Sequence, residues 1–160
     1  AAAYGTPMEI IRRTIKEFAG VEHRIELVRT RNGVRYYNDS IASSPSRTIA
    51  GLRSFPEKVI LIAGGYDKPS TSDAWIQAFD GKVRFLVLIG DTKEKIAKAA
   101  RSVGFNDIIM ADNLKEAVQI CHDKANAGDA VLLSPACASW DQFKSYEQRG
   151  ELFKEYVRAL

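Results

Sequence analysis

Short apolar runs alternate with helical patterns along most of the chain, and this alternation limits the folds that the sequence can adopt. The runs occupy residues 58–65, 83–90, 107–111 and 130–135. Such runs fit strands that are buried on both faces of a sheet. Helical patterns occupy about 46–54, 71–79, 92–103, 113–127 and 141–159. Strands that alternate with helices over short connections predict a parallel sheet with helices on both faces.

A β-hairpin is expected ahead of these units, at Asn32-Gly33, because both residues tolerate positive φ. Alternating segments at 24–31 and 34–38 supply its two strands. The chain of 160 residues is long enough for one such domain to bury a core without metals or disulfides. We therefore predict an α/β, Rossmann-like three-layer domain with a mostly parallel six-stranded sheet and an N-terminal β-hairpin.

The first residues predict a helix of their own, over about 6–18, with Thr6 as N-cap, Pro7 at the first helical position and Glu9 completing a capping box. Its apolar positions follow helical spacing, so one face needs a partner. The chain starts without Met, and its first Met lies inside this helix. We expect a fragment of a longer protein, with residues 1–22 as a remnant of a preceding domain and 23–160 as the domain itself.

Several classes of function are disfavoured. The net charge is only +3, and Lys and Arg alternate with acidic residues, so we expect no nucleic-acid partner. No apolar run approaches the roughly 20 residues of a membrane span, and a cytoplasmic protein is the default expectation. Cys121 and Cys137 have neither a metal-ligand spacing nor a disulfide framework. His23 and His122 are solitary, so we assign no metal site and no hydrolase triad.

In open parallel sheets, ligands bind beyond the carboxyl ends of the strands. Gly64-Gly65 followed by Lys68 fits either an anion site or a tight turn with a solvated lysine. Ser43 or Ser44 fits a helix N-cap, or, for Ser43, a group that holds a carboxylate. Asp39 has no evident structural duty and could accept from a ribose hydroxyl.

The last strand runs into a cluster that folding alone does not require: Ser134, Cys137, Ser139, Asp141 and Arg149. We expect a helix to begin at about Asp141, so that hydroxyls and helix N–H groups become donors for an anionic ligand. Ser139 is the candidate ligand residue. Trp140, Phe143 and Tyr146 are expected in the core rather than at a ligand.

Three stretches carry a resemblance to a known family: HRIELV through NGVRYYNDSIASSPSRTIAGL, then VILIAGGYDK, then VLLSPACASWDQFKSYEQRGELFKEYV. Over residues 23–160 the chain resembles the carboxyl-terminal domain of the Mur ligases, most closely of those that add D-glutamate. Residues 1–22 resemble the last helix of the central ATP-binding domain of these enzymes. The resemblance implies a monomeric, cytoplasmic enzyme of peptidoglycan synthesis that depends on ATP and Mg²⁺.

In such enzymes the carboxylate of UDP-N-acetylmuramoyl-L-alanine is activated as an acyl phosphate, which the amine of D-glutamate then attacks. The resemblance places the P-loop and the magnesium ligands in the central domain and the uridine nucleotide in the first, and this chain has no GxxxxGK[ST]. It therefore implies no catalytic residue here and no activity for the fragment alone.

The family's motifs assign binding roles to residues of this chain. Ser43, Lys68, Ser139 and Tyr146 would hold the D-glutamate carboxylates, and Arg24 and Asp39 would contact ATP, Asp39 at the ribose. Tyr146 stands where Phe is frequent. Ile41 stands where the family commonly has Lys, so an expected positive charge near the phosphates is absent at that position.

Two other hypotheses stay open. The folylpolyglutamate synthase group shares the architecture and the acyl phosphate chemistry, although the SPACAS run argues against it. A stand-alone module that binds an acidic metabolite would explain the missing P-loop, but it would give the apolar face of the helix at 6–18 no domain to pack against.

Overall fold

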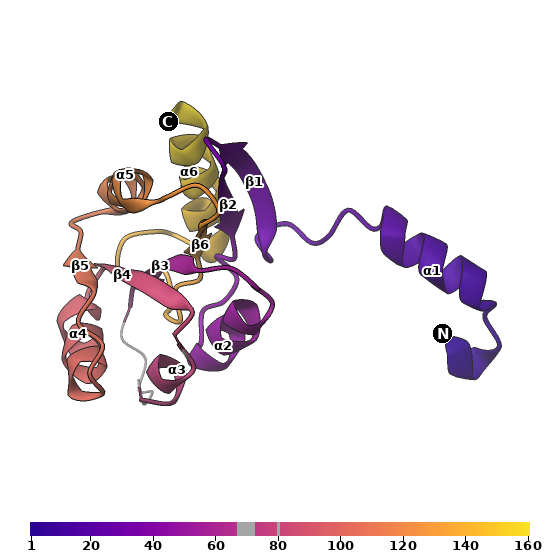
Figure 1. Cartoon of the computed structure of the whole chain (residues 1–160), viewed down its shortest axis with the longest axis horizontal. Helices are drawn as coiled ribbons and strands as arrows, with labels where there is room; N and C mark the ends of the chain where they lie inside the picture. Colours follow the sequence, from indigo (N-terminus) through magenta and orange to yellow (C-terminus); the bar gives the residue numbers. More distant parts are fainter. Residues whose placement is uncertain (67–72, 80) are drawn as a thin grey trace.

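The computed structural model describes residues 1–66, 73–79 and 81–160. Within these residues the chain forms a six-stranded sheet with the order β1-β2-β6-β3-β4-β5 (Figure 1). The strands are β1 (Glu26–Arg31), β2 (Val34–Asn38), β3 (Val59–Gly64), β4 (Val83–Ile89), β5 (Ile108–Met110) and β6 (Ala130–Leu133). Strands β1 and β2 pair antiparallel through the expected hairpin, and the other neighbours pair parallel. The predicted sheet is confirmed.

Helices cover both faces of this sheet. They are α2 (Pro45–Arg53), α3 (Asp73–Gln77), α4 (Lys93–Ser102), α5 (Leu114–Lys124) and α6 (Tyr146–Ala159). A short 3-10 turn, η1 (Ala2–Tyr4), and helix α1 (Met8–Glu17) come first in the chain and do not pack on the sheet. Apolar side chains of α2, α3 and α4 share one core cluster with the sheet. Those of α5 and α6 share the other. This arrangement confirms the three-layer prediction.

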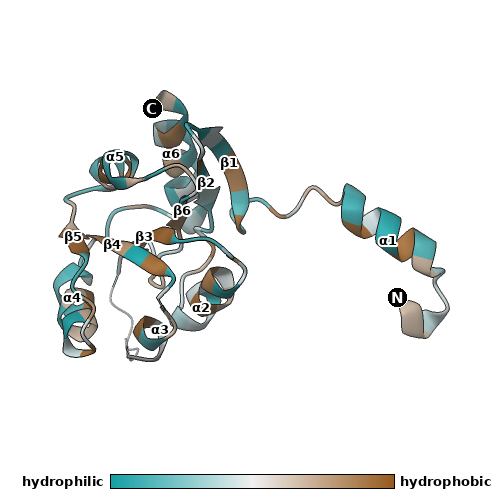
Figure 2. Cartoon of the chain, in the orientation of Figure 1, coloured by the Kyte–Doolittle hydropathy of each residue, from teal (hydrophilic) through white to brown (hydrophobic). Residues whose placement is uncertain are grey.

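The central strands β3 and β6 are buried along their whole length, as continuous apolar runs predict. Successive side chains of β3 alternate between the two core clusters, Ile60 and Ile62 toward one and Leu61 and Ala63 toward the other. Figure 2 shows hydrophobic residues concentrated in β3, β4 and β5, whereas hydrophilic and hydrophobic residues alternate along the helices. Among the described residues, none of the helices combines the length and apolar character that crossing a membrane would require.

Helix α1 stands away from the sheet on an extended linker (Figure 1). All ten of its residues are described, and none is buried. Ile15 is 70% exposed, and Phe18, just after the helix, is 65% exposed. The capping prediction was wrong, because the helix begins at Met8 with Pro7 in the N-cap position and no side-chain capping bond from Thr6. The division of the chain near residues 20–23 stays a prediction.

The last helix begins later than expected. It starts at Tyr146 rather than near Asp141, and Ser145 is its N-cap, with the hydroxyl accepting from the Gln148 N–H at 3.3 Å. Residues 134–145, named the β6 loop below, form turns instead. Trp140 was expected in the core, but it is 63% exposed.

Candidate functional site

The carboxyl ends of β2 and β6 lie side by side at one edge of the sheet, and each leads directly into polar residues. Asn38 is opposite Leu133 in the two strands, and the Asp39 N–H donates to the Leu133 carbonyl at 2.8 Å. The Ser134 hydroxyl donates to the Asp39 carboxylate at 2.7 Å. The segments that follow these two strands therefore meet, as expected for neighbouring strand ends.

Asp39 lines a small pocket of about 170 Å³ at this edge. The lining residues are Arg24, Ile25, Asp39, Ile41, Ala42, Arg47, Ala50 and Gly51. Asp39 is 4% exposed, and burial raises the pKa of its carboxyl to about 6, although the Ser134 hydroxyl, the Ile25 backbone and Arg24 and Arg47 favour the charged form. The structure thus brings together Arg24 and Asp39, the two residues assigned to ATP.

The chemistry of this pocket suits part of a nucleotide. Guanidinium groups of Arg24 and Arg47 offer donors that match phosphate oxygens, and the Asp39 carboxylate offers an acceptor for a hydroxyl. Its volume is below the roughly 300–1,000 Å³ of a typical ligand pocket. A nucleotide held here would therefore have most of its surface outside the pocket.

A buried arginine ties α6 to both loops at this edge. Arg149 donates through Nε to the Ser40 hydroxyl at 3.0 Å, through Nη2 to the Ser40 carbonyl at 2.9 Å and through Nη1 to the Cys137 carbonyl at 3.2 Å. The Ser40 hydroxyl donates in turn to the Tyr146 carbonyl at 2.7 Å. Burial lowers the pKa of Arg149 to about 10, so its guanidinium is still charged at neutral pH.

Arg149 belongs to the cluster named from the sequence after the last strand, but no role was predicted for it. A signal was available, because Arg149, Phe153 and Val157 follow one another at intervals of four and share the buried side of α6. A charged residue in register with a buried apolar stripe is rarely placed there without partners.

The β6 loop is also fixed from the other side. Ala136 has a left-handed backbone with φ 59°, and its N–H donates to the Ala42 carbonyl at 2.9 Å. The Tyr66 N–H, just beyond β3, donates to the Ala138 carbonyl at 2.9 Å. Gly65 allows this approach, because a Cβ at that position would lie 2.3 Å from the Ala138 carbonyl oxygen. The loop is thus held between the segments that follow β2 and β3.

Ser139 lies at the end of this fixed stretch and is 2% exposed. Its carbonyl accepts from the Gln142 and Phe143 N–H groups, the latter at 2.8 Å, which closes a turn. The prediction that a helix starts beside Ser139 was wrong, so the donors near it belong to loop backbone. Next to it, the exposed rings of Tyr66 and Trp140 lie with their centroids 5.7 Å apart.

The remaining residues assigned to D-glutamate fall in three places. Ser43 is half-buried just before α2, and Ser44, not Ser43, is the N-cap of that helix. Tyr146 is the half-buried first residue of α6, with its ring edge-on to that of His23 at 5.9 Å. Lys68 lies outside the described residues, so its place in the site stays a prediction.

Among the described residues, one group of histidine and acidic side chains comes close enough to suggest a metal ion: Glu22, His23 and Glu151. The ammonium of Lys154, however, lies 2.6 Å from Glu22 and 2.7 Å from Glu151. This ammonium already serves as the cation beside both carboxylates, and Mg²⁺ prefers a shell of oxygens without imidazole. This group therefore does not fit the magnesium ion that the resemblance implies.

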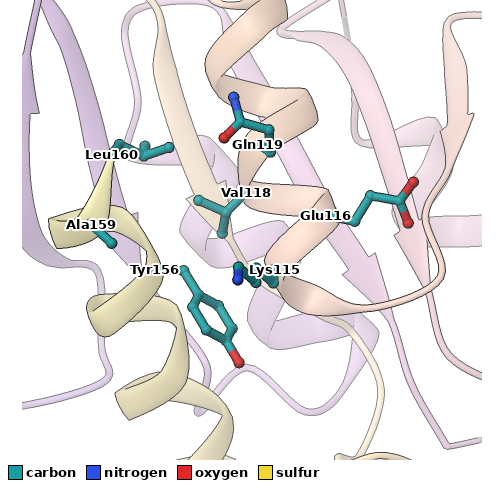
Figure 3. Close-up of a pocket in the computed structure, with 7 residues that line it drawn as sticks. All are labelled: Lys115, Glu116, Val118, Gln119, Tyr156, Ala159 and Leu160. Atoms are coloured by element: carbon teal, nitrogen blue, oxygen red, sulfur yellow. The ribbon is translucent and has the colours of Figure 1, made fainter.

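A pocket of about 400 Å³ opens between α5 and α6 (Figure 3). Val118 and Tyr156 point into the space between the two helices, whereas the Glu116 carboxylate points away from α6. Tyr156 lies about 15 Å along the helix axis from Tyr146, where α6 meets the strand ends. This pocket is therefore separate from the site.

Comparisons with known proteins identify the family of this chain. A family model described as "Mur ligase, glutamate ligase domain" matches residues 23–137. A UDP-N-acetylmuramoylalanine–D-glutamate ligase from Lachnoclostridium phytofermentans is 54% identical over 160 residues, covering 100% of this chain and 35% of the relative. The enzyme of the same name from Acetivibrio thermocellus is 54% identical over 159 residues, covering 95% of this chain and 34% of the relative. The chain spans about a third of the length of these relatives.

Solved structures share the fold at lower identity. The UDP-N-acetylmuramate-alanine ligase of Thermotoga maritima superposes with a TM-score of 0.70 at 16% identity, over 99% of this chain and 35% of that one. A folylpolyglutamate synthase of Mycobacterium tuberculosis, complexed with ADP and AMPPCP, gives 0.62 at 17% identity, over 95% of this chain and 37% of that one. These likenesses concern the fold alone.

Proposed function

The chain belongs to the Mur ligase family, whose glutamate ligase domain it carries, and we propose that it is the carboxyl-terminal domain of a UDP-N-acetylmuramoylalanine–D-glutamate ligase. In this proposal, the whole enzyme adds D-glutamate to UDP-N-acetylmuramoyl-L-alanine in the cytoplasm, as a step of peptidoglycan synthesis. The observation that carries it is the match in sequence to ligases of that name along the whole chain. The edge where the segments after β2, β3 and β6 meet supplies the site.

When bound, ATP would supply the phosphoryl group that turns the carboxylate of UDP-N-acetylmuramoyl-L-alanine into an acyl phosphate for attack by the amine of D-glutamate. The residues of this chain hold the attacking partner. Ser43, Ser139 and Tyr146, together with the charge of Lys68, would bind its two carboxylates and leave its amine exposed. Holding reactants in a productive geometry can lower the activation barrier by roughly 7–11 kcal/mol.

The pocket around Asp39 is the proposed contact for the nucleotide. Asp39 would accept from a ribose hydroxyl, and Arg24 would place its guanidinium toward the phosphates. Ile41 brings no charge to this pocket, but Arg47 lines it as well, and its Nη1 donates to the Ile41 carbonyl at 3.0 Å. We propose that Arg47 supplies the positive charge that the family's lysine would bring.

The scaffold of the site would depend on Arg149. It bonds to Ser40, which lies between Asp39 and the segment of Ser43, and to Cys137, two residues before Ser139. The D-glutamate side and the ATP side of the site therefore share one buried guanidinium. Arg149 would act by positioning these segments and not by contact with substrate.

Residues 1–22 would be the end of the central domain, which would carry the P-loop and the Mg²⁺ ligands. Exposed apolar side chains on and beside α1, Ile15 and Phe18 among them, support this proposal, because that face would pack inside the missing domain. The sequence upstream of Ala1 tests it. An in-frame GxxxxGK[ST] a few hundred residues earlier is expected, and a start codon directly before Ala1 would favour a stand-alone binding module.

Steady-state kinetics of the complete ligase test the substrate assignment. We expect turnover with D-glutamate and little with L-glutamate, and we expect Ser139→Ala to raise the KM for D-glutamate more than the KM for ATP. Lys124→Ala, on the exposed surface of α5, is the control and should change neither. Turnover of a folate in place of the muramoyl nucleotide would instead favour the folylpolyglutamate synthase hypothesis.

A further inference from the structure

Arg24 lies between two residues whose backbone is left-handed. His23 has φ 62° and Ile25 has φ 47°, conformations that residues other than glycine, and β-branched residues above all, seldom adopt. Such conformations persist only where the surrounding contacts enforce them. The contacts of residues 22–26 therefore decide where the Arg24 side chain leaves the backbone.

The carboxylate of Glu26 makes the first of these contacts. Its Oε2 accepts from the His23 N–H at 3.0 Å and from the Asn38 amide at 3.1 Å. The same Asn38 amide lies 2.9 Å from Nδ1 of the His23 ring. His23 is 5% exposed, and a Cβ at Gly150 would lie 2.3 Å from Nδ1 of its ring, so α6 leaves room for the ring only because residue 150 is glycine.

Lys154 holds the carboxylates of this segment together. Its Nζ lies 2.6 Å from Glu22, 2.7 Å from Glu151 and 3.4 Å from Glu26. Burial disfavours the charged form of Lys154, but its hydrogen bonds to Glu151 and Glu22 outweigh burial and raise its pKa. The Lys154 ammonium thus draws two residues of the 22–26 segment, Glu22 and Glu26, onto α6.

We propose that Lys154 is a positioning residue for Arg24, acting through Glu22 and Glu26; this inference rests on the proposed function, in which Arg24 contacts ATP. Lys154 does not line the pocket around Asp39, whereas Arg24 does. Without the ammonium, the three carboxylates repel one another and Glu26 turns toward water. The His23 N–H then loses its acceptor, and the segment relaxes from the conformation that directs Arg24 toward the pocket.

The kinetic test uses the complete ligase. Lys154→Met is expected to raise the KM for ATP about tenfold while the KM for D-glutamate stays within about twofold, because only the nucleotide side of the site depends on Arg24. Lys154→Arg keeps the charge and is expected to retain most of the affinity for ATP. Equal loss for both substrates would overturn the proposal, because a merely structural defect would not distinguish them.

The Arg24→Ala variant separates failure of this inference from failure of the proposed function. If Arg24→Ala leaves the KM for ATP unchanged, the assignment of Arg24 to ATP is wrong and the positioning role falls with it. If Arg24→Ala raises that KM and Lys154→Met does not, only the positioning role is wrong. We expect both to raise it, and the double variant to add little to Arg24→Ala alone.

A second measurement covers the case in which Lys154→Met folds poorly. Glu22 has 63% of its side chain exposed, so Glu22→Gln removes one partner of Lys154 without opening the core. In the 160-residue chain, we expect Glu22→Gln to speed amide hydrogen exchange at His23 severalfold, while exchange in β3 stays as in the parent. Lys124→Met serves as the control. Unchanged exchange at His23 would overturn the proposal.

Discussion

The guanidinium of Arg149 donates to both the hydroxyl and the carbonyl of Ser40, from a position 109 residues further along the chain. Its third bond reaches the Cys137 carbonyl. One buried side chain therefore fixes the distance between the segment that follows β2 and the β6 loop, which carry most of the proposed ligand contacts.

Arg149→Met should destabilise the chain by about 3 kcal/mol, because the Ser40 and Cys137 carbonyls would be left buried without their donor. Urea unfolding measures the change. Arg158→Met, on the exposed side of the same helix, is the matched control and should change the free energy of unfolding by less than about 0.5 kcal/mol. Equal effects of the two variants would show that Arg149 does not tie the loops together.

Asp39→Asn should stabilise the chain at pH 7. Burial raises the pKa of Asp39 from 3.8 to about 6, so ionisation of this carboxyl opposes folding. Below about pH 4 the Asp39 carboxyl is protonated in both the folded and the unfolded chain, so it does not lower the free energy of unfolding of the parent. This free energy falls as the pH rises toward 6, and the full loss is reached above 6. The pKa difference corresponds to at most about 3 kcal/mol.

Unfolding of the parent and of Asp39→Asn between pH 4 and 8 measures this effect. The advantage of the variant should grow with pH over the window from 4 to 6 and then level off. The asparagine keeps an oxygen for the Ser134 hydroxyl, which donates to Asp39 in the parent. A constant difference across this pH range would contradict a raised pKa at Asp39.

Gly65→Ala should lower the free energy of unfolding by about 3 kcal/mol or more. The added Cβ would lie 2.3 Å from the Ala138 carbonyl oxygen and push the β6 loop away from β3. Gly104 also has a left-handed backbone, at φ 87°, but a Cβ there meets nothing within 4 Å. Gly104→Ala should therefore lower the free energy of unfolding only by the strain of a left-handed backbone at alanine, about 1–2 kcal/mol. Thermal unfolding of both variants separates the steric overlap at Gly65 from the backbone strain that both positions share. Equal losses of stability in the two variants would exclude the overlap with Ala138.

Ile41→Lys should lower the KM for ATP in the complete ligase, because it adds a positive charge to the pocket that holds Arg24 and Asp39. Arg47→Gln should raise that KM, since it removes the charge proposed to stand in for the lysine. Combining the two changes should restore part of the loss. If Arg47→Gln has no effect on the KM for ATP, Arg47 does not compensate for Ile41.

The sheet could be predicted because its signals are local. Apolar runs such as 58–65 and 130–135 can be buried only in a covered sheet, and Asn32 and Gly33, with φ 50° and 78°, adopt the positive φ that the hairpin needs. The strand ends then indicated which residues would converge. The contact between Asp39 and Ser134 also depends on β2 lying beside β6, a strand order that the sequence did not predict.

The start of α6 could not be placed by the same reasoning, because the β6 loop is shaped by distant contacts. Asp141 accepts from the Asp91 N–H at 3.2 Å, and this contact comes from the segment after β4. One local signal was overlooked, namely the spacing of Ser145 and Gln148, which is that of a capping box. The burial of Arg149 also depends on acceptors far away in the sequence.

In the proposed function, this domain holds D-glutamate at the edge formed by the segments after β2, β3 and β6. A titration of the complete ligase, with this domain isotopically labelled, tests it most directly. With D-glutamate we expect amide resonances of Ser43, Ser139 and Tyr146 to shift, and with L-glutamate at the same concentrations we expect much smaller shifts. Equal responses to the two enantiomers, or none at these residues, would show that D-glutamate does not bind at this edge.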